Sequence, residues 1–507
     1  MSPASPTLLE MQGITKAFGE VTALAGVDFS LRPGEIHALL GENGAGKTTL
    51  MNVLSGLYRA DGGRIVLDGR PASITAPRDA VAVGIGMVHQ HSELVGHLTA
   101  LDNIILGREG GGAVIRRARR RAEVDALGAR FGLAISLDAN VRALPVGVQQ
   151  KVEILKALYR GARILILDEP TTLLTPQEVD TLFATLREVT AGGVTVVFIT
   201  HKIREVLAAC DRITVMRQGR VVATLPRAGA DAGRLVELMI GERLPEPAVD
   251  APPANATVLL AVDNLMVTDE RNLPIIKQAT FALGAGELVG IAGISGNGQR
   301  ELGEALVGLR KIHAGNIVLD GADLTHAPPA ARLSRGVAFI PEDRLGDGIL
   351  PRSSVADTLM LGLHRVVFRG WRYDNRVARE LALKAISEFR IVCRSPEAPT
   401  ASLSGGNIQR VLAARALTLG ERAGGRLLVA MNPTRGLDVP STRFIHDQMR
   451  AFRHRGGAVL VVSEDLDELM GLCDRILVMA SGRITGQFPR AAFDAYQIGA
   501  LMSGSAA

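Results

Sequence analysis

A glycine-rich run at residues 41–49 combines residue types that are suited to binding phosphate groups. Its glycines let main-chain N–H groups wrap around phosphate oxygens, and a following helix would point its positive N-terminus at the same charge. Lys47 offers a positive charge to the β- and γ-phosphates of a nucleotide, and the Thr48 hydroxyl is a ligand for Mg²⁺. The predicted nucleotide-binding loop consists of Gly41, Glu42, Asn43, Gly44, Ala45, Gly46, Lys47, Thr48 and Thr49.

The same loop recurs in altered form between residues 293 and 301. Every glycine is kept, but Gln299 replaces the lysine and Arg300 takes the position of the metal-binding hydroxyl. A neutral amide supplies no charge to a phosphate group. We therefore expect the second loop to keep its fold and to bind nucleotide weakly or not at all.

Four further polar residues follow apolar runs that are typical of buried strands. Asp168 and Glu169 end the run at 163–168, which places both carboxylates at the carboxyl end of a strand, where α/β sheets bind ligands. Asp168 is suited to holding Mg²⁺ and Glu169 to activating the attacking water. His201 is predicted to hydrogen bond the γ-phosphate, although a lone histidine is more often structural. Gln90 is predicted to reach Mg²⁺ and the water.

The second copy lacks this group of residues. Met431 and Asn432 replace the two acids, Glu464 replaces the histidine, and Glu342 replaces the glutamine. Additional acids near a triphosphate repel it. These losses all indicate that the second site is deficient.

One element shows the opposite pattern. Ser404, Gly405 and Gly406 stand at the start of a helical run in the second copy, where free N–H groups favour phosphate. In the first copy Pro145 stands in place of the serine, with neither a hydroxyl nor an N–H group, and Val146 adds bulk.

The repeat extends to both ends of each copy, which predicts two domains at residues 7–243 and 257–503. A proline-rich stretch at 244–256 is typical of a short, stiff linker. Each copy alternates strand-like and helical runs, so we expect an α/β fold with a parallel sheet. Residues from about 98 to 160 lack strand-like runs and are predicted to form a helical insertion.

The composition is that of a chain with two large cores. It has 507 residues, of which 47% are hydrophobic, but no run that could cross a bilayer and no secretory signal at its N-terminus. Its three cysteines show no metal-binding spacing and are expected to be reduced.

A basic run at residues 116–121 contributes to the net charge of +5. A solvated helix face is the favoured interpretation, ahead of contact with anionic lipid. Nucleic acid is disfavoured because no aromatic residues interleave the arginines.

Together these motifs resemble the fused double ATP-binding subunit of ABC importers, in the branch that serves simple sugars and nucleosides. The resemblance spans nearly the whole chain. It implies two tandem P-loop ABC-type nucleotide-binding domains, each with a helical subdomain. It also implies that the domains pack head to tail, so that the loop around Lys47 shares one ATP with Ser404, Gly405 and Gly406.

The remaining motifs fit one complete and one deficient composite site. Asp438 is kept on the second copy, which would serve the complete site, whereas Thr175 replaces it on the first. Phe18 matches the family position where an aromatic ring stacks on adenine, with a core phenylalanine as the alternative.

The resemblance implies an ATPase, with ATP and Mg²⁺ bound, that energises the import of a small uncharged solute. Residues 87–91 and 148–155 favour a nucleoside, and a monosaccharide such as ribose, galactose or xylose is the alternative. Implied partners are two transmembrane permease subunits and an extracytoplasmic solute-binding protein, with no nucleic acid. The chain would lie peripherally at the cytoplasmic face of the inner membrane. A soluble tandem ATPase acting on ribosomes or RNA is the rival, disfavoured by the short linker and the lost site.

Overall fold

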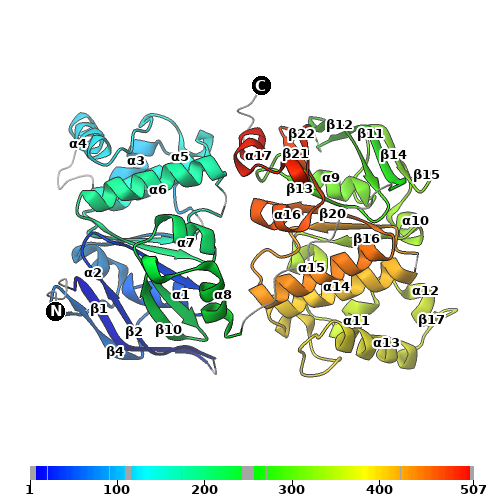
Figure 1. Cartoon of the computed structure of the whole chain (residues 1–507), viewed down its shortest axis with the longest axis horizontal. Coiled ribbons are helices and arrows are strands. Elements are labelled where there is room, and N and C mark those ends of the chain that lie inside the picture. Colours follow the sequence, from blue (N-terminus) through cyan, green and yellow to red (C-terminus); the bar gives the residue numbers. More distant parts are fainter. Residues whose placement is uncertain are drawn as a thin grey trace. The chain divides into compact units, whose positions relative to one another are not determined.

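The computed structural model describes residues 7–19, 21–90, 92–108, 116–172, 174–242, 256–269, 271–422 and 424–502. The chain divides into two compact units, residues 1–246 and 247–507, here called the first and second halves. Blue to green elements form the first half and green to red elements the second (Figure 1). The linker predicted at 244–256 lies outside the described residues except for Ala256.

The first half contains one antiparallel sheet and one mostly parallel sheet. The antiparallel sheet has the order β2-β1-β4-β5 and the other has the order β10-β9-β3-β8-β7-β6, with only β10 antiparallel to its neighbour. The strands are β1 Leu9–Phe18, β2 Val21–Leu31, β3 Ile36–Gly41, β4 Gly62–Leu67, β5 Arg70–Ala72, β6 Ile85–Val88, β7 Ile164–Asp168, β8 Thr195–Thr200, β9 Arg212–Arg217 and β10 Arg220–Pro226. The helices are α1 Lys47–Leu54, α2 Pro77–Ala82, α3 Ala100–Ile105, α4 Arg117–Arg130, α5 Val146–Tyr159, α6 Pro176–Ala191, α7 Ile203–Ala209 and α8 Ala232–Ile240.

The second half repeats this plan with the sheets β12-β11-β14-β15 and β16-β19-β20-β13-β21-β22, and adds the short hairpin β17–β18. Its strands are β11 Val258–Thr268, β12 Pro274–Gly284, β13 Leu288–Ala292, β14 Ala314–Leu319, β15 Ala322–Asp323, β16 Val337–Ile340, β17 Phe368–Arg369, β18 Arg372–Tyr373, β19 Leu427–Met431, β20 Ala458–Ser463, β21 Arg475–Ala480 and β22 Arg483–Pro489. Its helices are α9 Gln299–Leu306, α10 Pro329–Ser334, α11 Val355–Met360, α12 His364–Val367, α13 Asn375–Glu388, α14 Gly405–Arg422, α15 Val439–His454, α16 Leu466–Leu472 and α17 Ala495–Met502.

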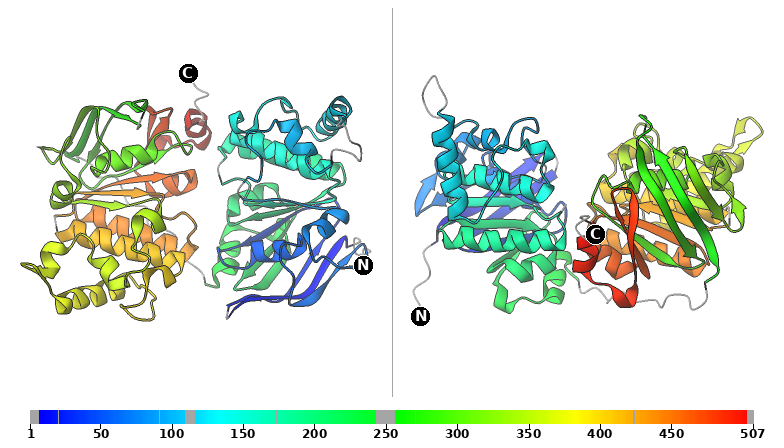
Figure 2. Two further views of the ribbon diagram at one scale, coloured as in Figure 1. Left: turned by 180° about the vertical axis from the view of Figure 1, so that it is seen from behind. Right: turned by 90° about the horizontal axis from the view of Figure 1, so that it is seen from above.

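The central strands carry apolar side chains on both faces because both faces are covered. Every residue of β3, β7 and β8 is buried, and separate hydrophobic clusters pack on the two sides of the sheet. Figure 2 shows helices and the antiparallel sheet as layers around the central strands of each half. Parallel strands end at one edge of the sheet, so the loops after β3, β6, β7 and β8 meet there.

The described residues between 98 and 160 form α3, α4, a short 3₁₀ turn and α5, as the absence of strand-like runs predicted. The basic run begins α4, and its arginines pair with acids: Arg117 with Asp102, Arg120 with Glu123, and Arg121 with Asp138. This pairing supports the interpretation as a solvated helix face. None of the helices in the described part of the chain is long and apolar enough to span a bilayer.

Candidate functional site

The loop after β3 has the backbone that its glycines predict. Gly46 caps α1 with φ +98°, and a Cβ atom there would lie 2.7 Å from the carbonyl oxygen of Ala23. Only glycine fits such a position without strain. Lys47, the first residue of α1, is 5% exposed and donates to the carbonyl oxygens of Gly41 and Glu42 at 2.8 and 2.9 Å.

Glu169 lies at the centre of the polar residues beyond the strands. It follows β7 with φ +47°, and its amide donates to the carbonyl of Ile199 on the neighbouring strand. One carboxylate oxygen lies 3.0 Å from Nδ1 of His201, and the other accepts a 3.3 Å hydrogen bond from Nε2 of Gln90. The structure therefore brings together three of the residues that the sequence predicted to act around the γ-phosphate and the attacking water.

The pKa values of the two acids, Asp168 and Glu169, shift in opposite directions. Burial would raise the pKa of Glu169, but the hydrogen bond and charge of His201 and the charge of Lys47 outweigh it, so its pKa lies below the ordinary value. Burial raises the pKa of Asp168 despite its contact with Thr48. Burial also lowers the pKa of the Lys47 amine, while both acids act against this shift. An ionised Glu169 is the state needed to accept a proton or orient water.

Thr48 and Asp168 could be neighbouring ligands of one magnesium ion. The Thr48 hydroxyl donates to Oδ1 of Asp168 at 3.4 Å, so two hard oxygen ligands lie close together. No group of three or more His, Cys, Asp or Glu side chains suited to a metal is found among the described residues. This donor set suits an ion that keeps most of its ligands from waters and phosphates, as Mg²⁺ does.

In the second loop a neutral amide takes the place of the Lys47 amine. Gly298 caps α9 with φ +103°, so the backbone keeps the shape of the first loop. The amide of Gln299 donates to the carbonyl of Ile294 at 2.9 Å, and Arg300 pairs with Glu304 and Asp347. The positive charge of Arg300 is thus already paired.

The hydrogen-bonding roles are reversed at the position equivalent to Glu169. In the first half the amide of Gln90 donates to Glu169, whereas in the second half an amide stands at the equivalent position and donates to an acid. The Asn432 side chain donates to Glu342 at 2.9 Å and accepts from the backbone amide of Glu464 at 3.2 Å. Arg435 Nη1 lies 3.3 Å from Glu342 and 3.7 Å from Glu464. The additional acids predicted from the sequence are therefore partly neutralised within the second half, and Arg435 was not recognised as their partner.

The segments 145–147 and 404–406 stand at the N-termini of the equivalent helices α5 and α14, but their residues differ. Ser404 and Gly405 are exposed before and at the start of α14, and Ser404 Oγ accepts from the Asn407 side chain at 2.9 Å. Pro145 precedes α5 and gives it no side-chain cap. Only the second-half segment presents the hydroxyl expected beside a phosphate.

Phe18 ends β1 and is 45% exposed, so it is not a core residue. Its ring contacts Tyr58 edge-on at 5.2 Å, and Lys16 Nζ lies 5.5 Å from its centre. An exposed aromatic face is compatible with stacking on a nucleotide base.

Comparison with known proteins defines the class. The model of the ABC transporter family matches residues 24–172 and 276–423, one match in each half. The chain belongs to the ABC transporter family, whose ATP-binding domains bind ATP.

Three relatives align with nearly the whole chain. A ribose import ATP-binding protein of Burkholderia cenocepacia is 41% identical over 94% of both chains. A nucleoside import ATP-binding protein of Lactococcus lactis is 39% identical over 99% of both chains. A glucose import ATP-binding protein of Haloferax volcanii is 38% identical over 98% of this chain and 96% of its own length.

Proposed function

We propose that this protein is the ATP-hydrolysing subunit that energises an ABC importer for a small uncharged solute. The observation that carries this proposal is that the first half holds a complete phosphate loop with Lys47, and that Glu169 beside it contacts both His201 and Gln90. Full-length similarity to sugar and nucleoside import ATP-binding proteins supports the import direction.

We further propose one working composite ATP site. Lys47 holds the phosphates, and Ser404, Gly405 and Gly406 complete their binding from the second half. Glu169, oriented by His201 and Gln90, accepts a proton from the attacking water, and Asp438 serves this same site. Mg²⁺, held by Thr48, Asp168 and Gln90, would supply charge neutralisation on the phosphate oxygens. Phe18 stacks on the adenine.

The second site is proposed to be inactive. Its loop lacks a lysine, and its acids are held by Arg435. Each turnover therefore consumes ATP at one position only.

The proposed partners are two transmembrane permease subunits and an extracytoplasmic solute-binding protein, with this chain bound peripherally at the cytoplasmic face of the inner membrane. A nucleoside is the first candidate solute and a monosaccharide the second. Calorimetry on the neighbouring solute-binding protein, followed by ATP-driven uptake of its ligand in proteoliposomes, tests both. Uptake without this chain, or sedimentation of this chain with ribosomes instead of membranes, would contradict the proposal.

A further inference from the structure

A buried side chain of the second half carries an amide without a hydrogen-bond partner. Gln409 lies on α14 and is 1% exposed, and neither its Nε2 nor its Oε1 has a partner among the described residues. Buried polar groups in folded proteins are almost always paired, because an unpaired one has lost its water without compensation. The unpaired amide therefore points to a second position of a neighbouring segment in which it is paired.

The equivalent side chain of the first half is paired. Gln150 is the fifth residue of α5, as Gln409 is the fifth residue of α14. The Nε2 of Gln150 donates to the carbonyl of Pro170 at 2.8 Å. Pro170 lies in the loop between β7 and α6, so this bond ties the loop to the helix.

The second half also contains the carbonyl that matches Pro170. Pro433 follows β19 at the same distance in sequence as Pro170 follows β7, and it is buried. Its carbonyl accepts no hydrogen bond from any residue that the structure describes. A donor and an acceptor that pair in the first half are thus both unpaired in the second.

A different residue holds the loop after β19, residues 432–438. Arg344, four residues beyond β16, donates to the carbonyl of Arg435 in this loop. The loop after β19 is therefore tied to the segment after β16, whereas the loop after β7 is tied to its helix by a glutamine.

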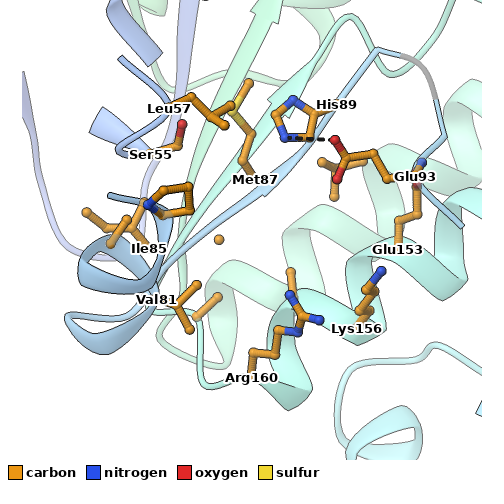
Figure 3. A pocket seen from close by; sticks show the side chains of 16 residues that line it. Ser55, Leu57, Val81, Ile85, Met87, His89, Glu93, Glu153, Lys156 and Arg160 are labelled. Atoms are coloured by element: carbon orange, nitrogen blue, oxygen red, sulfur yellow. Dashed lines mark hydrogen bonds and ion pairs between the residues drawn. The ribbon is translucent and has the colours of Figure 1, made fainter. Parts of the chain in front are cut away.

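The segment after β6 in the first half makes different contacts. Ser92 stands at the position of Arg344. The amide of the next residue, Glu93, donates to Glu153 of α5 at 3.0 Å, and the Glu93 carboxylate lies 3.7 Å from Nε2 of His89 (Figure 3). The serine is too short to hold the loop after β7 as Arg344 holds its counterpart.

Arg344 also lies beside the segment that is proposed to bind phosphate. A Cβ atom on Gly405 would lie 3.8 Å from Nη1 of Arg344. Burial, followed by the positive charge of Arg435, lowers the pKa of Arg344, and none of the described acids is among the charges that act on it. A phosphate oxygen is a stronger partner for a guanidinium than a neutral carbonyl is. A nucleotide at Ser404 and Gly405 would therefore compete with the loop for Arg344.

We propose that Gln409 is a positioning residue for the working ATP site, and that it takes over the loop after β19 when nucleotide binds. The phosphate draws the Arg344 guanidinium from the loop, and the Gln409 amide then donates to the Pro433 carbonyl. This bond fixes a loop that ends at Asp438, which caps α15 by accepting from the amide of Ser441 at 2.7 Å. The inference rests on the proposed composite site.

The two halves differ in their response to nucleotide. The bond from Gln150 to Pro170 exists already, so the loop after β7 has no further hydrogen bond of this kind to form. The loop after β19 gains one when nucleotide binds. Because Ser404 and Asp438 are proposed to serve the same site, Gln409 links the two elements that the second half contributes to it.

Hydrogen exchange of the full chain tests this order of events. The chain carries Glu169→Gln so that Mg·ATP stays bound, and exchange is measured by mass spectrometry at residues 432–438. We expect nucleotide to slow this exchange about fivefold, the factor that one net hydrogen bond supplies. Adding Gln409→Met should remove the slowing, whereas Gln150→Met, the matched control, should keep it. Slowing that survives Gln409→Met would overturn the proposal.

The phosphate loop, residues 41–49, reports nucleotide binding in the same spectra. If it is protected while residues 432–438 do not change, this inference is wrong and the proposed function stands. If it is not protected, the proposed function is wrong, and this inference with it.

Stability and turnover should change in opposite senses. Gln409→Met removes an unpaired amide, so the urea midpoint of the nucleotide-free chain should stay the same or rise, while kcat falls about fivefold. Gln150→Met breaks an existing bond, so it should lower the midpoint and leave kcat nearly unchanged. If Gln409 only supports the fold, Gln409→Met will lose stability and turnover together, and that result would contradict the proposal.

Arg344→Ser gives the second half the residue of the first and removes the competing bond. We expect residues 432–438 of this variant to exchange without nucleotide about as slowly as they do in the nucleotide-bound parent. Adding Gln409→Met should abolish this effect. Unchanged or faster exchange in Arg344→Ser would show that Arg344 does not control the loop.

Discussion

Nδ1 of His201 lies 3.0 Å from Oε1 of Glu169, although the two residues follow different strands. The contact places an imidazole beside a carboxylate whose pKa is lowered, mainly by that imidazole. It forms because β7 and β8 are parallel neighbours and end together.

Glu169→Gln should remove the proton acceptor while leaving the phosphate loop unchanged. We expect ATP binding to remain and steady-state phosphate release to fall by about 10²- to 10⁴-fold, the range for general base catalysis. Glu342→Gln, which changes the second half toward the first, is the control and should have little effect. Rapid turnover of Glu169→Gln would exclude this role.

Lys47→Ala should abolish turnover because the second loop has no lysine that could replace it. We expect a loss of at least about 100-fold in kcat, as when a preorganised charge is removed from the transition state. Gln299→Ala is the matched control in the other loop and should change the rate little. Most of the activity surviving in Lys47→Ala would contradict a single working site.

Ser404→Arg tests whether the second half completes the site. If Ser404 contacts the nucleotide bound by Lys47, the variant should lose nearly as much activity as Lys47→Ala, although the residue lies in the other half. Pro145→Arg is the control at the equivalent position of the first half. Equal activity of the two variants would show that Ser404 has no special role.

Glu35 offers a test of stability against pH. Burial would raise its pKa, but hydrogen bonds from His37 and Arg212 outweigh it and hold the pKa at about 2, below its ordinary 4.5. A lowered carboxyl pKa stabilises the fold above pH 4.5, and this contribution is lost as the pH falls toward 2. The shift corresponds to about 3 kcal/mol.

We therefore expect Glu35→Gln to lower the free energy of unfolding of the first half at pH 7, and the difference from the unmodified chain to shrink below pH 4.5. Urea unfolding followed by circular dichroism measures this, and hydrogen exchange assigns the change to the first half. Asp68→Asn breaks the exposed pair with Arg163 and should cost no more than about 1 kcal/mol. A pH-independent effect of Glu35→Gln would contradict the assignment.

The parts of the fold and site that depend on a local sequence pattern could be predicted from the sequence. The glycines of the phosphate loop, the acids at the end of β7 and the helical segment at about 98–160 each follow from residue type and spacing along the chain. Such patterns are readable because the first four residues of β7 are apolar, Asp168 ends the strand and Glu169 follows it.

Features that depend on contacts between distant elements could not be predicted from the sequence. Arg435 contacts Glu342 and Glu464 only because three distant segments fold together. No spacing in the sequence predicts these two ion pairs. The groove lined by α2, β6 and α5 (Figure 3) is likewise formed by side chains from segments that are distant in the sequence, so no local spacing predicts it.

The inward-folded amide of Gln299 has an evolutionary consequence. A reversion to lysine would restore one charge but would leave Arg300 at the hydroxyl position and Asn432 in place of the water-activating acid. No single codon change would therefore rebuild the arrangement of the first half. If the second site is inactive, as proposed, a return to two working sites requires substitutions at three separate positions.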